Sequence, residues 1–107
     1  MPIKEITVKE LKTMIDGKID FQLIDVRETD EHTFCNIGGE LIPLGSVLQH
    51  VDRIRKDKTV VVYCRSGRRS GEIIEQLQNR FGLTNLVNLS GGILAWSDEI
   101  DPTIPKY

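Results

Sequence analysis

The chain has 107 residues and a mass of 12.1 kDa, with 14 basic and 16 acidic residues and a net charge of −2. This length fits one domain, and 39% hydrophobic residues can form its core. The mild acidity argues against nucleic-acid and membrane-surface binders, and no apolar run approaches the roughly 18 residues of a membrane span. The N-terminal residues lack a signal-peptide stretch. We therefore expect a cytoplasmic protein with residues 1–107 in a single domain.

The two cysteines, Cys35 and Cys64, do not make a disulfide framework, and neither belongs to a CxxC pair or a Cys/His cluster. We therefore expect no metal and no cofactor. The charge is distributed unevenly, because residues 53–80 hold eight basic against three acidic residues. This electropositive segment of an acidic chain needs a local explanation.

The first part of the chain predicts a strand, a helix and a second strand. We expect the strand over residues 5–7 and the helix over residues 8–16, with Thr7 as the N-cap and Gly17 at the helix end. Residues 21–26 are mostly apolar, which predicts a strand buried on both faces.

The middle of the chain carries weaker patterns. Residues 30–34 predict a helical turn, and residues 41–43 predict a short edge strand because Pro43 cannot donate to a sheet ladder. Residues 47–54 have apolar side chains at positions 47, 48, 51 and 54, which predicts a helix lying against the sheet.

The last part opens with the strongest strand, residues 59–63, which is β-branched and which we therefore place centrally. A helix with Ile73, Ile74, Leu77 and Phe81 on one face and Gly82 at its end follows. Residues 86–89 predict a strand, a short helix follows Gly91-Gly92, and two prolines predict an extended tail over residues 101–105. The alternation predicts an α/β fold, a mainly parallel five-stranded sheet flanked by helices in three layers.

The candidate chemistry lies in residues 64–70, which follow the predicted central strand and lead into the next helix. Backbone N–H groups of such a turn form an anion-binding concavity at the carboxyl edge of the sheet. Gly67 allows the loop to wrap around that concavity. Arg65, Arg68 and Arg69 add positive charge around it. The segment therefore predicts an anion site.

Cys64 is the candidate nucleophile of this site. Helix N-termini and neighbouring cations lower the pKa of a thiol, so we expect a thiolate near neutral pH. The same amides would hold an anionic covalent intermediate. A buried structural cysteine beside solvated arginines is the plain alternative, but a glycine with three arginines favours a functional loop.

Four segments, in the right order and spacing, resemble the rhodanese-like sulfurtransferases. They are residues 23–27 with Glu31; Ile37, Gly39, Ile42 and Pro43; residues 61–70; and residues 89–96. The resemblance implies that Cys64 takes a sulfane sulfur from an anionic donor such as thiosulfate and passes this persulfide sulfur to a thiophilic acceptor. It also implies donor binding by Arg65, Ser66, Gly67, Arg68, Arg69 and Ser70. Asp25 and Arg27 match positions that support the loop, and we favour a structural ion pair as their role.

Residues 35–44 and the tail over residues 100–107 resemble rhodanese domains fused to enzymes that adenylate sulfur-carrier proteins. This resemblance implies a sulfur-carrier protein as acceptor, and we expect a monomer or a weak dimer. Two alternatives stay open: a non-catalytic binding or regulatory module, and a phosphatase of related fold. Phosphatases use C-x5-R, whereas here Arg69 comes five positions after Cys64 and Ser70 six, which favours sulfur transfer. Cys35 is interpreted as a bystander.

Overall fold

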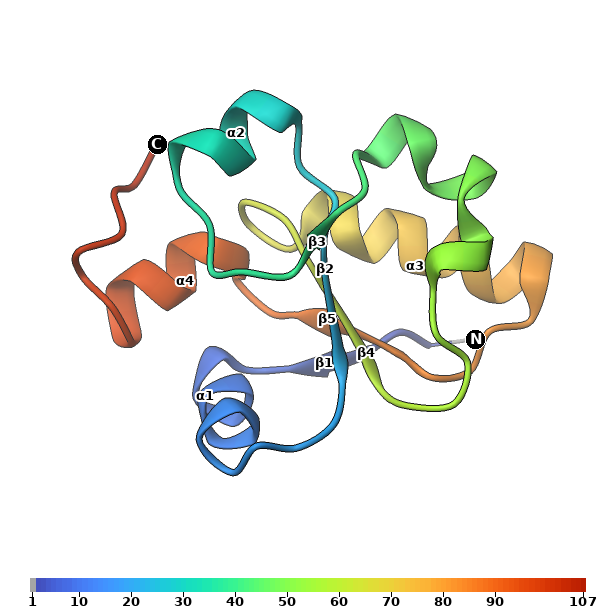
Figure 1. Cartoon of the computed structure of the whole chain (residues 1–107), viewed down its shortest axis with the longest axis horizontal. Coiled ribbons are helices and arrows are strands. Elements are labelled where there is room, and N and C mark those ends of the chain that lie inside the picture. Colours follow the sequence, from blue (N-terminus) through green and yellow to red (C-terminus); the bar gives the residue numbers. More distant parts are fainter. Residues whose placement is uncertain (1) are drawn as a thin grey trace.

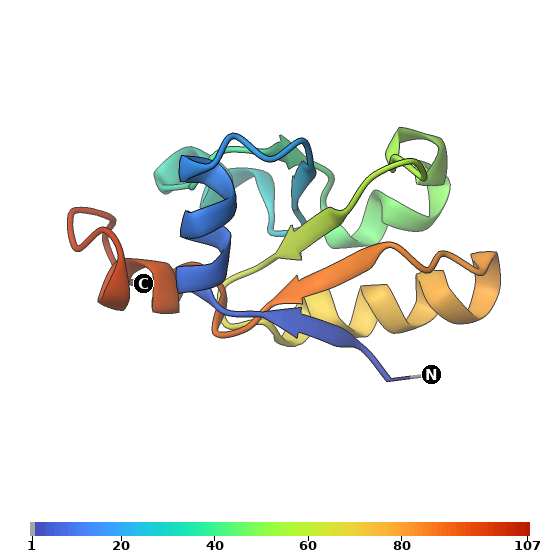
Figure 2. The ribbon, with the colours of Figure 1, turned by 90° about the horizontal axis from the view of Figure 1, so that it is seen from below.

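Five parallel strands form one sheet in the computed structural model, which describes residues 2–107. The strand order is β1-β5-β4-β2-β3, and each neighbouring pair runs parallel, as the aligned arrows of β1, β5 and β4 illustrate (Figures 1 and 2). The strands are β1 (Lys4–Ile6), β2 (Gln22–Asp25), β3 (Glu40–Leu41), β4 (Val60–Tyr63) and β5 (Leu86–Leu89). The predicted α/β class, the central place of β4 and the edge place of β3 are confirmed.

Helices cover both faces of this sheet. They are α1 (Val8–Asp16), α2 (Thr29–Phe34), the 3₁₀ segments η1 (Leu44–Gln49) and η2 (Val51–Arg53), α3 (Arg68–Phe81) and α4 (Gly92–Glu99). In Figure 1, α3 and the 3₁₀ segments lie on one side of the strands and α1 and α4 on the other. The three predicted layers are present.

The strand β4 belongs to two apolar cores at once. Val60 and Val62 pack in the cluster that includes the apolar residues of α3, whereas Val61 and Tyr63 pack with those of α1 and α4. Successive side chains of a strand point to opposite faces. An uninterrupted apolar strand is therefore what a central position between two helix layers requires.

Thr7 is the N-cap of α1, as predicted. Its side-chain oxygen accepts a hydrogen bond from the Glu10 N–H (3.1 Å), and the Glu10 carboxylate accepts one from the Thr7 N–H (2.9 Å). This reciprocal pair is a capping box, which satisfies two backbone donors at the helix start.

The helix predicted over residues 47–54 is wrong in type. The segment forms η1 and η2, which are separated at His50, where φ is −129° and ψ is 34°. That backbone leaves the helical region, so the chain makes only i→i+3 bonds, such as the one from the His50 N–H to the Val47 carbonyl (3.0 Å). The apolar stripe is right, because Val47 and Ile54 are buried against the sheet.

Two expectations near chain reversals are also wrong. Phe81 is 47% exposed rather than buried, because the left-handed Gly82 turns the chain and Leu83 covers the core instead. The tail is not extended throughout, because the Ile104 N–H donates to the Asp101 carbonyl (3.1 Å) and closes a turn. Pro102 at the second position of this turn has the φ that the turn needs.

Beyond that turn the tail folds back across α4. The Ser97 hydroxyl donates to the Ile104 carbonyl (2.6 Å), and the chain then runs to α2, where its last residue lies (Figure 1). Over residues 2–107, every helix is too short or too polar to cross a membrane.

Candidate active site

Residues 64–67 connect β4 to α3 at the carboxyl edge of the sheet. Cys64 directly follows the strand and is 1% exposed, so its sulfur lies at the base of the loop. Gly67 is the N-cap of α3 with φ +98°, a left-handed conformation that strains any residue with a side chain. This turn lets the Gly67 N–H point back at the Cys64 sulfur.

Hydrogen-bond donors surround that sulfur. The Gly67 N–H donates to Cys64 Sγ at 3.1 Å and the Ser70 N–H at 3.5 Å, and the Ser70 Oγ lies at 3.4 Å. Burial raises the pKa of the Cys64 thiol. Hydrogen bonds from Ser70 and from the N–H groups of Gly67 and Ser66 together lower this pKa by a larger amount. The net shift of the pKa is downward, which favours the thiolate. We call the N–H groups of Gly67 and Ser70 that face Cys64 Sγ the sulfur cradle.

The first turn of α4 holds the carbonyl side of the same loop. The Ile93 N–H donates to the Cys64 carbonyl (3.0 Å) and the Leu94 N–H to the Arg65 carbonyl (3.1 Å). Such an approach requires a glycine at position 92, since a Cβ there would lie 2.5 Å from both carbonyl oxygens. With its carbonyls bound to α4, the loop can present its N–H groups to the sulfur.

The three loop arginines are paired with other protein groups. Arg65 binds the Tyr107 carbonyl and lies over the Tyr107 ring, 5.2 Å from its centroid. The Arg68 side chain is 86% exposed and faces Glu72 on the outside of α3 (3.4 Å).

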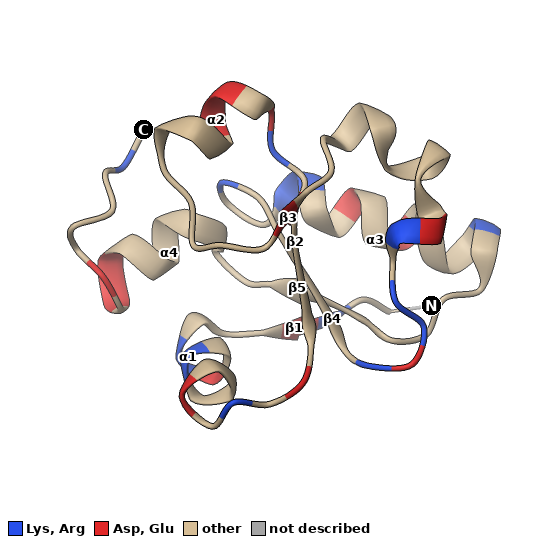
Figure 3. Ribbon diagram, in the orientation of Figure 1, with Lys and Arg blue, Asp and Glu red and all other residues tan. Residues whose placement is uncertain are grey.

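Arg69 binds the Glu31 carboxylate through two nitrogens, at 2.8 and 2.9 Å. Figure 3 shows the basic loop and first turn of α3 together with the acidic residues of α2. Of the three loop arginines, Arg68 and Arg69 therefore face carboxylates, and Arg65 faces a carbonyl.

Glu31 and Tyr107 join α2, the tail and the loop. The Glu31 carboxylate accepts hydrogen bonds from Arg69, from the Glu28 N–H (3.0 Å) and from the Tyr107 hydroxyl (2.8 Å). Its bidentate bond with Arg69 lowers the pKa of Glu31 to about 2, against the opposing effect of burial. In the sequence, Glu31 stood out only as part of a motif and Tyr107 only as part of the tail, and nothing indicated that the two residues meet.

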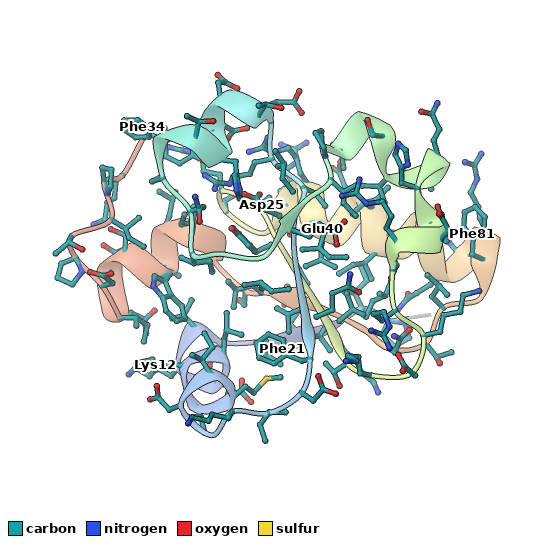
Figure 4. All side chains as sticks on the ribbon, viewed as in Figure 1. Lys12, Phe21, Asp25, Phe34, Glu40 and Phe81 are labelled. Atoms are coloured by element: carbon teal, nitrogen blue, oxygen red, sulfur yellow. The ribbon has the colours of Figure 1, made fainter. Side chains whose placement is uncertain are left out.

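Asp25 and Arg27 form a buried ion pair, with Nη2 and Oδ2 2.8 Å apart and both side chains fully buried. Figure 4 places Asp25 in the interior, whereas Phe34 projects at the edge of α2. Arg27 also donates to the Cys35 carbonyl (2.6 Å) and the Tyr107 hydroxyl (2.9 Å). The pair therefore reaches the loop arginines through Tyr107.

Two further features lie apart from the cradle. The sulfur of the buried Cys35 is 3.7 Å from the Pro105 carbonyl oxygen, so this thiol packs under the tail. A groove of about 340 Å³ runs between α4 and the tail and contains no residue of the loop. Among residues 2–107, no three His, Cys, Asp or Glu side chains gather where they could hold a metal ion.

Comparisons with known proteins fit this geometry. The family model described as "Rhodanese-like domain" matches residues 7–99. YtwF of Bacillus subtilis, which bears the name of a sulfurtransferase, is 37% identical over 103 residues, covering 95% of this chain and 98% of YtwF.

MoeZ of Mycobacterium tuberculosis, named as an adenylyltransferase and sulfurtransferase, is 33% identical over 105 residues. The match covers 95% of this chain and 26% of MoeZ, so the chain spans about a quarter of that relative. The crystal structure of a rhodanese-like domain protein from Staphylococcus aureus superposes with a TM-score of 0.81 at 27% identity, covering 98% of this chain and 99% of the other.

Proposed function

This chain belongs to the family of rhodanese-like domains, and from this premise we propose that it is a sulfurtransferase in which Cys64 carries the transferred sulfur. The sulfurtransferase names of YtwF and MoeZ support the class of reaction. The observation that carries the proposal is the sulfur cradle: donors from Gly67 and Ser70 converge on Cys64 Sγ, where an anion has to be held.

In the first half-reaction, the Cys64 thiolate attacks the outer sulfur of thiosulfate. The bond between the two sulfur atoms of thiosulfate breaks, and its electron pair leaves with sulfite. The outer sulfur stays on Cys64 as a persulfide. The persulfide is an anion at neutral pH, so oriented N–H groups stabilise it as they stabilise the thiolate. Arg65 and Ser66 lie on the exposed side of the loop, where a dianionic donor would approach, whereas Arg68 faces Glu72 on the outside of α3.

In the second half-reaction, a thiophilic acceptor attacks the outer persulfide sulfur. The sulfur–sulfur bond breaks, the sulfur leaves on the acceptor, and Cys64 returns as a thiolate. The likeness to MoeZ supports a sulfur-carrier protein as this acceptor. The acceptor's reactive end must be narrow, because the outer sulfur is bonded to Cys64, which lies at the base of the loop and is almost fully buried.

The position of Arg69 argues against phosphate chemistry. A phosphatase needs a guanidinium that faces the phosphate oxygens, and both terminal nitrogens of Arg69 are bound to Glu31 instead. The cradle holds one sulfur atom with donors from the same turn, which suits a terminal sulfur better than a tetrahedral phosphate.

Intact-mass measurement after treatment with thiosulfate tests the proposal. The wild-type protein and a Cys35→Ser control should each gain one sulfur atom, and Cys64→Ser should gain none. Turnover with thiosulfate and a small thiol should follow the same pattern. A folded wild-type protein that gains no sulfur, or that instead releases phosphate from an aryl phosphate, would remove the proposed function.

A further inference from the structure

A polar chain of three residues lies under the sulfur cradle. It runs from Ser70 through Asn88 to Glu5, and it crosses from α3 to the strands β5 and β1. Asn88 is 3% exposed in an otherwise apolar strand, in register with Val62 on one side and Glu5 on the other. A buried amide costs stability unless its polar atoms make hydrogen bonds. The hydrogen bonds of Asn88 therefore show why a polar side chain occupies this buried position.

The partners of Asn88 determine how its side chain is oriented. Nδ2 donates to the Gly67 carbonyl (2.9 Å) and to the Glu5 carboxylate (3.0 Å), and both of these groups can only accept. The amide nitrogen therefore has to face them, and Oδ1 has to face the Ser70 hydroxyl, 2.5 Å away. Glu5, on the neighbouring strand, thus locks the amide in one orientation.

The two ends of this amide hold the two residues that form the cradle. Gly67 and Ser70 each direct an N–H at Cys64 Sγ, and Asn88 binds the carbonyl of the first and the hydroxyl of the second. We propose that Asn88 is a positioning residue for Cys64, whose carboxamide fixes the spacing of the two N–H donors around the sulfur. This role rests on the proposed function, since it serves sulfur transfer only if Cys64 is the nucleophile.

A glycine in α3, Gly71, leaves room for the Asn88 side chain. Gly71 lies in the first turns of α3, and a Cβ at that position would come within 3.3 Å of Asn88 Nδ2. Glycine inside a helix costs about 1 kcal/mol relative to alanine. The chain accepts this cost directly after Ser70, at a position where a side chain would crowd the amide of Asn88.

The pH dependence of Cys64 alkylation tests the proposal. In a Cys35→Ala background, the rate of reaction with iodoacetamide is measured from pH 5 to pH 10 for the parent and for Asn88→Ala. Losing the anchor for two donors to an anion should shift the midpoint upward and slow alkylation at pH 6 by about tenfold, the size expected for one lost hydrogen bond to a charged group.

Asn85→Ala is the matched control. Its amide nitrogen also donates two hydrogen bonds, here to the backbone carbonyls of Arg55 (2.8 Å) and Lys58 (2.7 Å), and these lie away from the loop. This variant should lose stability without any shift in the alkylation midpoint. The control therefore shows that a loss of stability alone does not shift the alkylation midpoint.

An unchanged midpoint in folded Asn88→Ala would overturn the proposal. A lower midpoint would overturn it too, because Asn88 would then be withholding the Ser70 proton from the sulfur. If Asn88→Ala does not fold, Asn88→Ser replaces it, since a serine stays polar but cannot span from Gly67 to Ser70. Alkylation needs no sulfur donor, so the two tests can fail separately. A wild-type protein that takes up no sulfur would contradict the proposed function, and the effect of Asn88 on alkylation could still be measured.

Discussion

The backbone N–H groups and the arginine side chains of residues 64–70 are turned in opposite directions. The N–H groups of Gly67 and Ser70 face the Cys64 sulfur, whereas the guanidinium groups of Arg68 and Arg69 face carboxylates on α3 and α2. One loop thus has an inner set of donors fixed by the fold and an outer set of charges paired with other elements.

The difference lies in how each kind of group is held. A backbone N–H is positioned by the dihedral angles of the turn and costs no reorganisation when an anion forms beside it. An arginine has a long flexible side chain, and a nearby carboxylate such as Glu31 binds it before any substrate arrives. The amides therefore face the sulfur, whereas Arg69 holds α2 and Arg65 holds the tail to the loop.

Gly67→Ala should have the largest effect on the reactivity of Cys64, because it disturbs the N–H groups that face the sulfur. A side chain at φ +98° costs about 1–3 kcal/mol, and its Cβ would lie 3.2 Å from the Leu89 carbonyl oxygen. We expect lower thermal stability and slower alkylation of Cys64 at neutral pH. Gly82→Ala is the control, since it has φ +66° at the other end of α3 with open space around it. Equal Cys64 reactivity in the two variants would contradict a cradle made by the backbone.

Glu31→Gln should have the next largest effect, on stability rather than on reactivity. The pKa of Glu31 is held at about 2, below its ordinary 4.5, so the charged carboxylate stabilises the fold above pH 4.5 and loses that effect as the pH falls toward 2. Urea unfolding should show the variant to be less stable by about 1–3 kcal/mol at pH 7. This gap should close near pH 2.

The matched variant for this experiment is Glu10→Gln. Glu10 has the same capping-box position at the start of α1 but accepts no hydrogen bond from an arginine. Its stability gap should be small and should not depend on pH in the way that the Glu31 gap does. A gap at Glu31 that is constant from pH 7 to pH 2 would show that its bond with Arg69 contributes little.

Arg68→Ala should have the smallest effect. Its side chain is exposed, and an exposed pair four residues apart on a helix contributes about 0.3–0.5 kcal/mol. The KM for thiosulfate should change by less than about twofold, as should that of Arg80→Ala, another exposed arginine on α3, because exposed charges are screened by salt. A rise of fivefold or more in Arg68→Ala alone would show that this arginine reaches the donor.

Much of the fold follows from local patterns. The β-branched run of β4 predicted the central strand, Thr7 predicted the start of α1, and Pro43 predicted an edge strand. Two of the errors fall where the chain reverses. Phe81 and the tail after Asp101 depend on turns whose geometry is decided by what packs beside them, so hydrophobic spacing alone did not reveal it.

The sequence by itself determined the family, the α/β order of the elements and the place of Cys64 in a strand-to-helix loop, because these depend on residues that are close together along the chain. Only the tertiary structure decided which groups face the sulfur and which arginines are already paired. Tyr107 meets Glu31 across 76 positions and Asn88 meets Glu5 across 83. Such contacts follow from strand register and from the path of the tail, and no local pattern encodes either.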